Sequence, residues 1–236
     1  MLERIAFLRI GASLLAAGLC ARAAGAAVLS LDFNARTSVD VADTQPGFTA
    51  FTLNDSGSTV NGVKITFSAI GAGTSLGDRD RTAPLNSGAF TSSEILDDFV
   101  FAKATTNSVP TGMDIRLEGL APSTPYGISL FAYDSGSAGT RTARWSGNGT
   151  ALFTTSFAGA FSAIPADDLV NRYDATALTD AAGTLTLSGR LAGGNPAVFA
   201  DGLIISGIAP EPSSMATFGA IGACLLLRRR RRRSIA

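Results

Sequence analysis

The chain of 236 residues has no histidine and two cysteines, and both shortages limit its chemistry. Without histidine it cannot form a Ser-His-Asp triad, a Cys-His pair, a histidine-ligated zinc site or an imidazole proton shuttle. Cys20 and Cys224 both lie outside residues 27–209, so this central stretch has no disulfide and no cysteine metal cluster. We therefore expect no cofactor and no metal site of these kinds.

The formal net charge of zero conceals an acidic centre. The block 228–233 supplies six of the 19 basic residues, and three more lie before residue 27. Residues 27–209 hold ten basic and 17 acidic residues, a net charge of −7. A domain of this charge repels phosphate backbones, so we expect no nucleic-acid partner.

The N-terminus has the three parts of a secretory signal. Arg4 and Arg9 precede the apolar stretch 10–19, and small residues follow, with Ala-x-Ala sites ending at Ala23 and Ala26. An apolar helix of ten residues rises about 15 Å, whereas the hydrocarbon core of a membrane is about 30 Å thick. We predict a signal peptide over 1–26, which signal peptidase removes.

The C-terminus combines three unlike features in a fixed order. Pro210, Glu211 and Pro212 precede the apolar segment 213–227, which ends at a block of arginines. Prolines stop a preceding strand, and by the positive-inside rule the arginines stay in the cytoplasm. The central domain would then face outward. The block consists of Arg228, Arg229, Arg230, Arg231, Arg232 and Arg233.

This order of features resembles the PEP-CTERM protein-sorting domain of Gram-negative bacteria. The resemblance covers 210–236 and implies that a membrane-embedded exosortase processes the tail near Pro210, Glu211 and Pro212. It also implies a transient stay in the inner membrane, followed by the cell surface or an exopolysaccharide-rich matrix. The segment 213–227 has 15 residues, fewer than the roughly 20 that usually span a bilayer. A resident single-pass membrane protein is the alternative.

Between these ends the pattern is that of strands. Val63, Ile65 and Phe67 alternate with polar residues, as do the residues of 113–117, so each segment has one wet face. No helical crossovers interrupt the series, which favours an all-β fold, a single β-sandwich of jelly-roll type over 27–209. A signal helix and a C-terminal transmembrane helix would flank it. The other expected strands are 28–33, 48–53, 98–103, 126–133, 151–157, 184–188 and 198–206.

The segments 119–126, 133–134 and 201–205 resemble galactose-binding-like or carbohydrate-module sandwiches of exported bacterial proteins, which implies a glycan ligand such as an extracellular polysaccharide. Sugar sites on sandwiches use an exposed aromatic ring beside hydrogen-bonding side chains. Trp145, the single tryptophan, lies in a polar setting and is the candidate ring, although a half-buried core position is the alternative. The candidate glycan-binding residues are Tyr133, Asp134, Arg144, Trp145 and Tyr173.

Candidates for catalysis are weak. Residues 73–77 match the Gly-x-Ser-x-Gly spacing of a hydrolase, but a nucleophile elbow needs a following helix and a histidine. In each of the acidic pairs 97–98 and 167–168 the two residues are adjacent, so on a strand their side chains point to opposite faces and cannot act together as an acid and a base. We expect them to be solvated charges in turns. The charged segment 78–81 is expected to be a polar loop in which arginines pair with aspartates; calcium there or elsewhere is the alternative.

The sequence therefore predicts an exported, non-enzymatic protein of the cell surface or extracellular matrix, with a structural or glycan-binding function. No catalytic residue is assigned. The alternatives are an exported polysaccharide-degrading enzyme and the resident membrane protein already mentioned.

Overall fold

The computed structural model describes residues 27–37, 43–104, 111–136, 139–159, 164–194 and 197–207. All of them belong to one compact unit, residues 24–210. The expected signal peptide and sorting tail lie outside the described residues. Within the described ranges, no helix has the length and the apolar composition that a membrane span requires.

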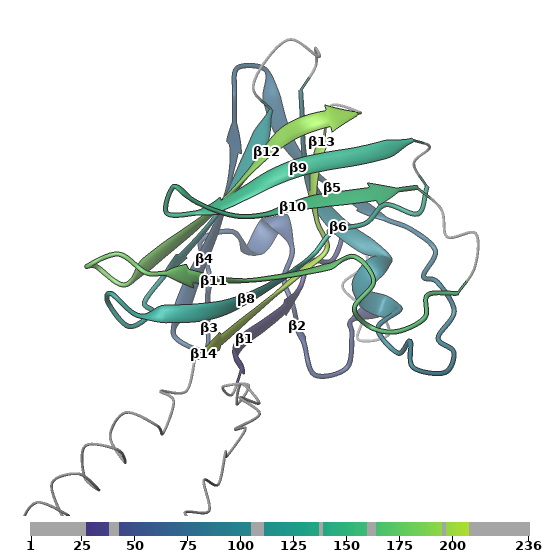
Figure 1. Ribbon diagram of the computed structural model, residues 1–236, viewed down its shortest axis with the longest axis horizontal. Helices are drawn as coiled ribbons and strands as arrows, with labels where there is room; N and C mark the ends of the chain where they lie inside the picture. The colour runs from purple at the N-terminus through teal and green to yellow at the C-terminus, as the bar shows by residue number, and fades with distance from the viewer. Residues whose placement is uncertain are drawn as a thin grey trace, which may run out of the picture. The chain divides into compact units, whose positions relative to one another are not determined.

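The described residues form fourteen strands and two short 3-10 turns (Figure 1). The turns are η2 (Leu53–Asp55) and η3 (Glu94–Leu96). The strands are β1 (Ala27–Asp32), β2 (Thr49–Ala50), β3 (Thr59–Val60), β4 (Val63–Ile70), β5 (Thr74–Asp80), β6 (Asp98–Ala104), β7 (Gly112–Glu118), β8 (Pro125–Phe131), β9 (Thr140–Gly147), β10 (Thr150–Ala158), β11 (Arg172–Leu178), β12 (Thr184–Gly194), β13 (Ala197–Ala200) and β14 (Gly202–Gly207).

The strands assemble into three sheets, and the prediction of an all-β sandwich is confirmed. A five-stranded sheet has the order β11-β8-β14-β1-β2, and a six-stranded sheet has the order β10-β9-β12-β7-β4-β3. A small third sheet has the order β13-β6-β5. All named pairs are antiparallel except β1 with β2. Figure 1 shows β8, β11 and β14 on one side and β9, β10 and β12 on the other.

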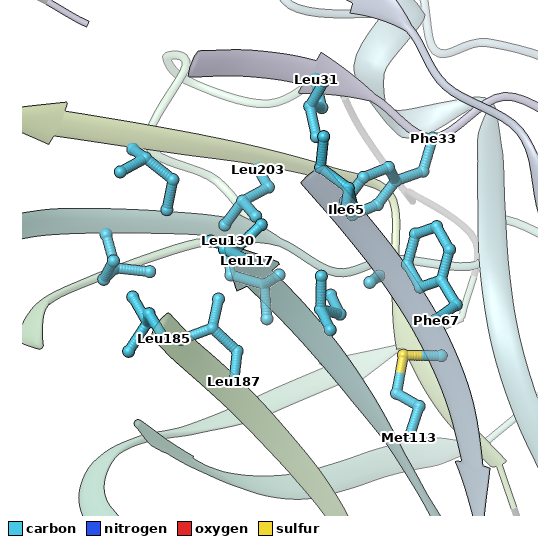
Figure 2. Close-up of a cluster of buried hydrophobic side chains, with 14 of the residues drawn as sticks. Leu31, Phe33, Ile65, Phe67, Met113, Leu117, Leu130, Leu185, Leu187 and Leu203 are labelled. Carbon is cyan, nitrogen blue, oxygen red and sulfur yellow. The ribbon is translucent and has the colours of Figure 1, made fainter. Parts of the chain in front are cut away.

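The two larger sheets bury a common apolar core, because each presents every second side chain to the other. In β4, for example, Val63, Ile65 and Phe67 are buried, and Lys64 on the opposite face is exposed. Burying one such side chain contributes about 1.5–3 kcal/mol. Figure 2 shows the meeting of the two faces, with Leu31, Leu130 and Leu203 from the five-stranded sheet and Leu117, Leu185 and Leu187 from the six-stranded sheet.

Three expectations about the strands were wrong. The segment 48–53 is a strand only in part, since β2 covers Thr49–Ala50 and Leu53 begins η2. The segment 198–206 is not one strand: β13 ends at Ala200 and β14 begins at Gly202, because the chain leaves the small sheet for the five-stranded sheet at Asp201. The segment 78–81 is not a polar loop, since most of it belongs to β5. This strand lies at the edge of the small sheet, where charged side chains are tolerated and discourage further pairing.

Candidate functional site

A tight turn between β9 and β10 builds one end of the candidate site. Asn148 and Gly149 have φ values of 47° and 83°, the left-handed conformation that a two-residue hairpin of type I′ requires. The side chain of Asn148 then crosses to the neighbouring strands. Its Nδ2 donates to the carbonyl oxygens of Leu178 and Thr184, both at 3.0 Å, and its Oδ1 accepts from the N–H of Thr186 at 2.9 Å. One of these bonds fixes the turn to the end of β11, and the other two fix it to the start of β12.

Beside this turn lies an open cleft of about 500 Å³, which we call the β10–β11 cleft. β10 is an edge strand of the six-stranded sheet and β11 an edge strand of the five-stranded sheet, and the two lie side by side (Figure 1). Leu178 is 57% exposed, unusual for a large apolar side chain. The lining residues are Pro125, Gly147, Asn148, Thr150, Leu152, Thr176, Ala177, Leu178, Thr179 and Asp180.

The lining combines apolar carbon with unused hydroxyls. Thr150 and Thr176 are exposed, and neither hydroxyl makes a hydrogen bond to another described residue. Asp180 is exposed as well, but its Oδ1 accepts from the N–H groups of Ala182 and Thr184 at 2.9 and 2.8 Å. The cleft can therefore offer hydroxyls, a carboxylate oxygen and an apolar surface to a ligand.

Farther along the same two strands the sheets are joined by Tyr173. Its ring stacks on Phe153 of β10, with ring centroids 5.9 Å apart. Its hydroxyl donates to the carbonyl oxygen of Ser156 at 2.8 Å and accepts from the N–H of Ser156 at 3.0 Å. Burial raises the pKa of Tyr173, so the hydroxyl keeps its proton and its donor function. Tyr173 thus holds β10 against β11.

The structure does not bring the five candidate glycan-binding residues together. Trp145 is 2% exposed and belongs to the core, so its ring presents no free face to a sugar. Tyr133 is 1% exposed and packs on Phe157 at 5.7 Å. Asp134 is buried and accepts from Nε of Arg81 at 3.0 Å.

The remaining two candidates lie on different surfaces. Arg144 is exposed on β9, one residue before Trp145, because neighbouring residues of a strand point to opposite faces. Tyr173 lies between β10 and β11, where its hydroxyl is already bonded. The cleft residues Thr150, Thr176 and Leu178 were missed in the sequence, where scattered threonines and a leucine give no signal.

The hydrolase-like spacing does not form a nucleophile elbow. Ser75 lies within β5, between Gly73 and Gly77, and β5 continues as a strand to Asp80 instead of turning into a helix. Gly77 has a packing reason instead: a Cβ atom there would lie 2.6 Å from Cζ of Phe101, so the ring needs this glycine.

The two acidic pairs have different environments. Asp167 is exposed, as expected for a solvated charge, and Asp168 accepts from the N–H and the hydroxyl of Thr91 at 2.6 and 2.7 Å. Partial burial raises the pKa of Asp168, but hydrogen bonds from Thr91 and Ser92 outweigh it and leave the pKa below its usual value. For Asp97 and Asp98 the expectation of solvated charges was wrong.

Asp97 and Asp98 belong instead to what we call the acidic cluster: Asp32, Asp97, Asp98 and Asp201. Their exposed fractions are 0%, 6%, 0% and 0%. Asp32 ends β1, Asp97 follows η3, Asp98 begins β6, and Asp201 occupies the corner between β13 and β14. The fold therefore gathers them from three separate regions of the sequence.

Burial is the main cause of high pKa values throughout the acidic cluster. It raises the pKa of Asp32 to about 8, of Asp97 to about 9 and of Asp98 to about 7, and that of Asp201 well above its usual value. The negative charge of Asp98 adds to the rise at Asp32 and at Asp97. Near neutral pH these groups therefore resist carrying charge without a compensating cation.

Comparison with known proteins gives distant structural neighbours. No family model matches the chain, and no curated protein does so either. The structural neighbours include carbohydrate-binding modules and also enzymes, among them an exo-β-1,3-galactanase and an isomalto-dextranase. The family 22 xylan-binding domain from Paenibacillus barcinonensis is 10% identical, with 79% of this chain and 97% of that one covered and a TM-score of 0.42.

Two modules from Clostridium thermocellum are also distantly similar to this chain in structure. For its C-terminal family 22 module the identity is 12%, the coverage is 61% of this chain and 86% of that one, and the TM-score is 0.39. For its family 35 module the identity is 16%, the coverage is 61% of this chain and 98% of that one, and the TM-score is 0.33. With TM-scores below 0.5, the likeness assigns neither a ligand nor a site residue to this chain.

Proposed function

We propose that this chain is an exported, non-enzymatic β-sandwich protein that binds a neutral glycan in the β10–β11 cleft. The observation that carries the proposal is the pairing of the exposed Leu178 with the unused hydroxyls of Thr150 and Thr176 in an open cleft of about 500 Å³. A sugar ring has apolar C–H faces and a rim of hydroxyls, and binding clefts pair an apolar lining with a few polar groups. Asp180 and the net charge of −7 over 27–209 disfavour an acidic polymer.

The cleft lining supports binding without catalysis. A glycoside hydrolase uses two carboxyl groups about 5–10 Å apart on either side of the scissile bond. Asp180 is the one acidic residue among those that line the cleft in the described part of the chain. The acidic cluster has no residue in that lining, and the sequence has no histidine to serve instead.

The proposal that the protein is exported rests on its two terminal sequence segments. Signal peptidase would remove 1–26, and exosortase would process the tail near Pro210, Glu211 and Pro212 and release the domain to the surface or matrix. Mass spectrometry of the mature protein from cells with and without the exosortase tests this step. A mature form that still ends at Ala236 in cells with the enzyme would rule it out.

Glycan binding is tested by affinity electrophoresis of the full-length protein, in mild detergent, through gels that contain neutral or acidic polysaccharides. We expect retardation by a neutral polymer and a loss of affinity of about 5–30-fold in Leu178→Ala, because apolar contact worth about 1–2 kcal/mol disappears. The control is Leu169→Ala, which removes a similarly exposed leucine outside the cleft lining. Equal mobility in every gel, or equal weakening by both substitutions, would refute the assignment.

A further inference from the structure

The sequence has two Asn-Gly pairs, Asn61-Gly62 and Asn148-Gly149. Both form two-residue hairpin turns, the first between β3 and β4 and the second between β9 and β10. Their backbones are nearly the same, because Asn61 and Gly62 have φ values of 49° and 82° and Asn148 and Gly149 have values of 47° and 83°. All four residues are exposed. Backbone conformation and solvent exposure therefore do not distinguish the two pairs.

The side chains of the two asparagines differ in their hydrogen bonds. The Nδ2 atom of Asn148 donates to the carbonyl oxygens of Leu178 and Thr184, and its Oδ1 accepts from the N–H of Thr186. Within the described residues, the side chain of Asn61 makes no hydrogen bond. The carboxamide of Asn61 therefore rotates in water, whereas that of Asn148 is held in one orientation.

The hairpin around Asn61 is also the shorter of the two. β3 has two residues, lies at the edge of the six-stranded sheet and pairs with β4 at two positions. Backbone hydrogen bonds from Gly57 to Ile65 and from Ile65 to Ser58 continue this hairpin. β9 and β10, in contrast, pair at eight positions. Because fewer contacts must break, the turn at Asn61 opens more readily than the turn at Asn148.

An asparagine that precedes glycine can react with its own backbone. The backbone nitrogen of the glycine loses its proton and attacks Cγ of the asparagine. The new N–Cγ bond closes a five-membered succinimide ring, and the Cγ–Nδ2 bond breaks and releases ammonia. Water then opens the ring at either carbonyl and leaves aspartate or isoaspartate. Glycine favours the attack because it has no side chain to shield the nitrogen and it allows the backbone to rotate.

We propose that Asn61 is a deamidation site of this protein, and that its hydrogen bonds protect Asn148 from the same reaction. The attack requires the carboxamide to turn until Cγ faces the nitrogen of the following glycine. This rotation breaks all three side-chain hydrogen bonds of Asn148 and none at Asn61. Three such bonds together favour the unreactive orientation by at least about 10-fold.

The protected asparagine is the one in the β10–β11 cleft. Asn148 lines the cleft and Asn61 does not. Deamidation of Asn148 would remove the Nδ2 donor that ties its turn to Leu178, whereas deamidation of Asn61 leaves the cleft lining intact. The three hydrogen bonds therefore preserve the covalent structure of the cleft as well as its shape. This inference goes beyond glycan binding and does not depend on it.

The test incubates the full-length protein in mild detergent and neutral buffer at physiological temperature. Proteolytic digestion and mass spectrometry then measure the deamidated fraction at each asparagine over time. We expect this fraction to grow at least about 10-fold faster at Asn61 than at Asn148. In guanidinium chloride the two rates should agree to within about 2-fold, because the unfolded chain lacks the hydrogen bonds of Asn148 and glycine follows both asparagines.

A variant assigns the released ammonia to its source. Asn61→Asp should fold, because aspartate also tolerates the left-handed conformation, and it is expected to release less than half as much ammonia as the unsubstituted protein. The control is Asn54→Asp, which alters an exposed asparagine that precedes Asp55 and should leave the release nearly unchanged.

Equal rates at Asn61 and Asn148 in the folded protein would overturn the proposal. A difference of the same size in guanidinium chloride would overturn it as well, because the local sequence and not the hydrogen bonds would then be the cause. Ammonia release that Asn61→Asp leaves unchanged would show that the reaction occurs elsewhere, and the proposal would fail.

Discussion

The stability of the domain should fall steeply as the pH rises from about 5 to about 9. Burial raises the pKa of Asp32 in the folded protein to about 8, while in the unfolded chain it has its ordinary value near 3.8. The folded state therefore binds the proton more tightly. The resulting contribution is fully present below pH 3.8 and is lost as the pH rises towards 8.

The magnitude follows from the two pKa values of Asp32. With these values, raising the pH from about 5 to about 9 removes about 4 kcal/mol of unfolding free energy at this residue alone. The high pKa values of Asp97, Asp98 and Asp201 act in the same direction. A loss of this size is a large fraction of the about 5–15 kcal/mol that stabilises an ordinary domain.

Urea unfolding in EDTA, followed by the fluorescence of Trp145, measures this loss. With a slope of about 2 kcal/mol per molar urea, the midpoint should fall by about 2 M or more between pH values of about 5 and 9. Asp32→Asn removes one titrating group and should show a smaller fall. A midpoint that stays constant across this range in EDTA would show that the cluster is not buried as described, and the reasoning would fail.

Two further predictions concern packing. Gly189→Ala should lower the unfolding free energy by about 1–3 kcal/mol in urea titrations, because the new Cβ would lie 2.7 Å from Cζ2 of Trp145. The control is Gly193→Ala, whose Cβ would have no atom within 4 Å, so it should change the unfolding free energy by less than about 0.5 kcal/mol. Similar losses in both would contradict this packing. Tyr173→Phe should cost about 0.5–1.5 kcal/mol by the same measurement, since it removes two hydrogen bonds to Ser156; an unchanged midpoint would contradict a joining function for the hydroxyl.

The strands that could be predicted are those with clean alternation. The segments 63–67 and 113–117 lie within β4 and β7, and inside these two segments apolar and polar residues alternate without exception. β5 was missed because Asp78, Arg79 and Asp80 have low strand preference, and it forms because β6 pairs with it along its whole length. Tertiary pairing decided this segment, and a single sequence does not contain that information.

The position of Trp145 illustrates why the candidate site could not be read from the sequence. Its inward neighbours on β9 include Arg141, which is 7% exposed and places its guanidinium over the ring of Phe199. A buried arginine hides the alternation that would have identified the core face. The acidic cluster was hidden for another reason, since Asp32, Asp98 and Asp201 meet only after the sheets have formed.

The position of β14 has a consequence for the order of folding. This strand is the last in the described chain, yet it lies in the middle of the five-stranded sheet, between β8 and β1. A nascent chain that lacks residues 202–207 would leave β1 without its antiparallel neighbour and the edge of β8 open. Because the pairing of β1 with β14 spans almost the whole domain, assembly of this sheet must wait until the ribosome has synthesised its final strand. Until then the unpaired edges of β1 and β8 would be open to aggregation.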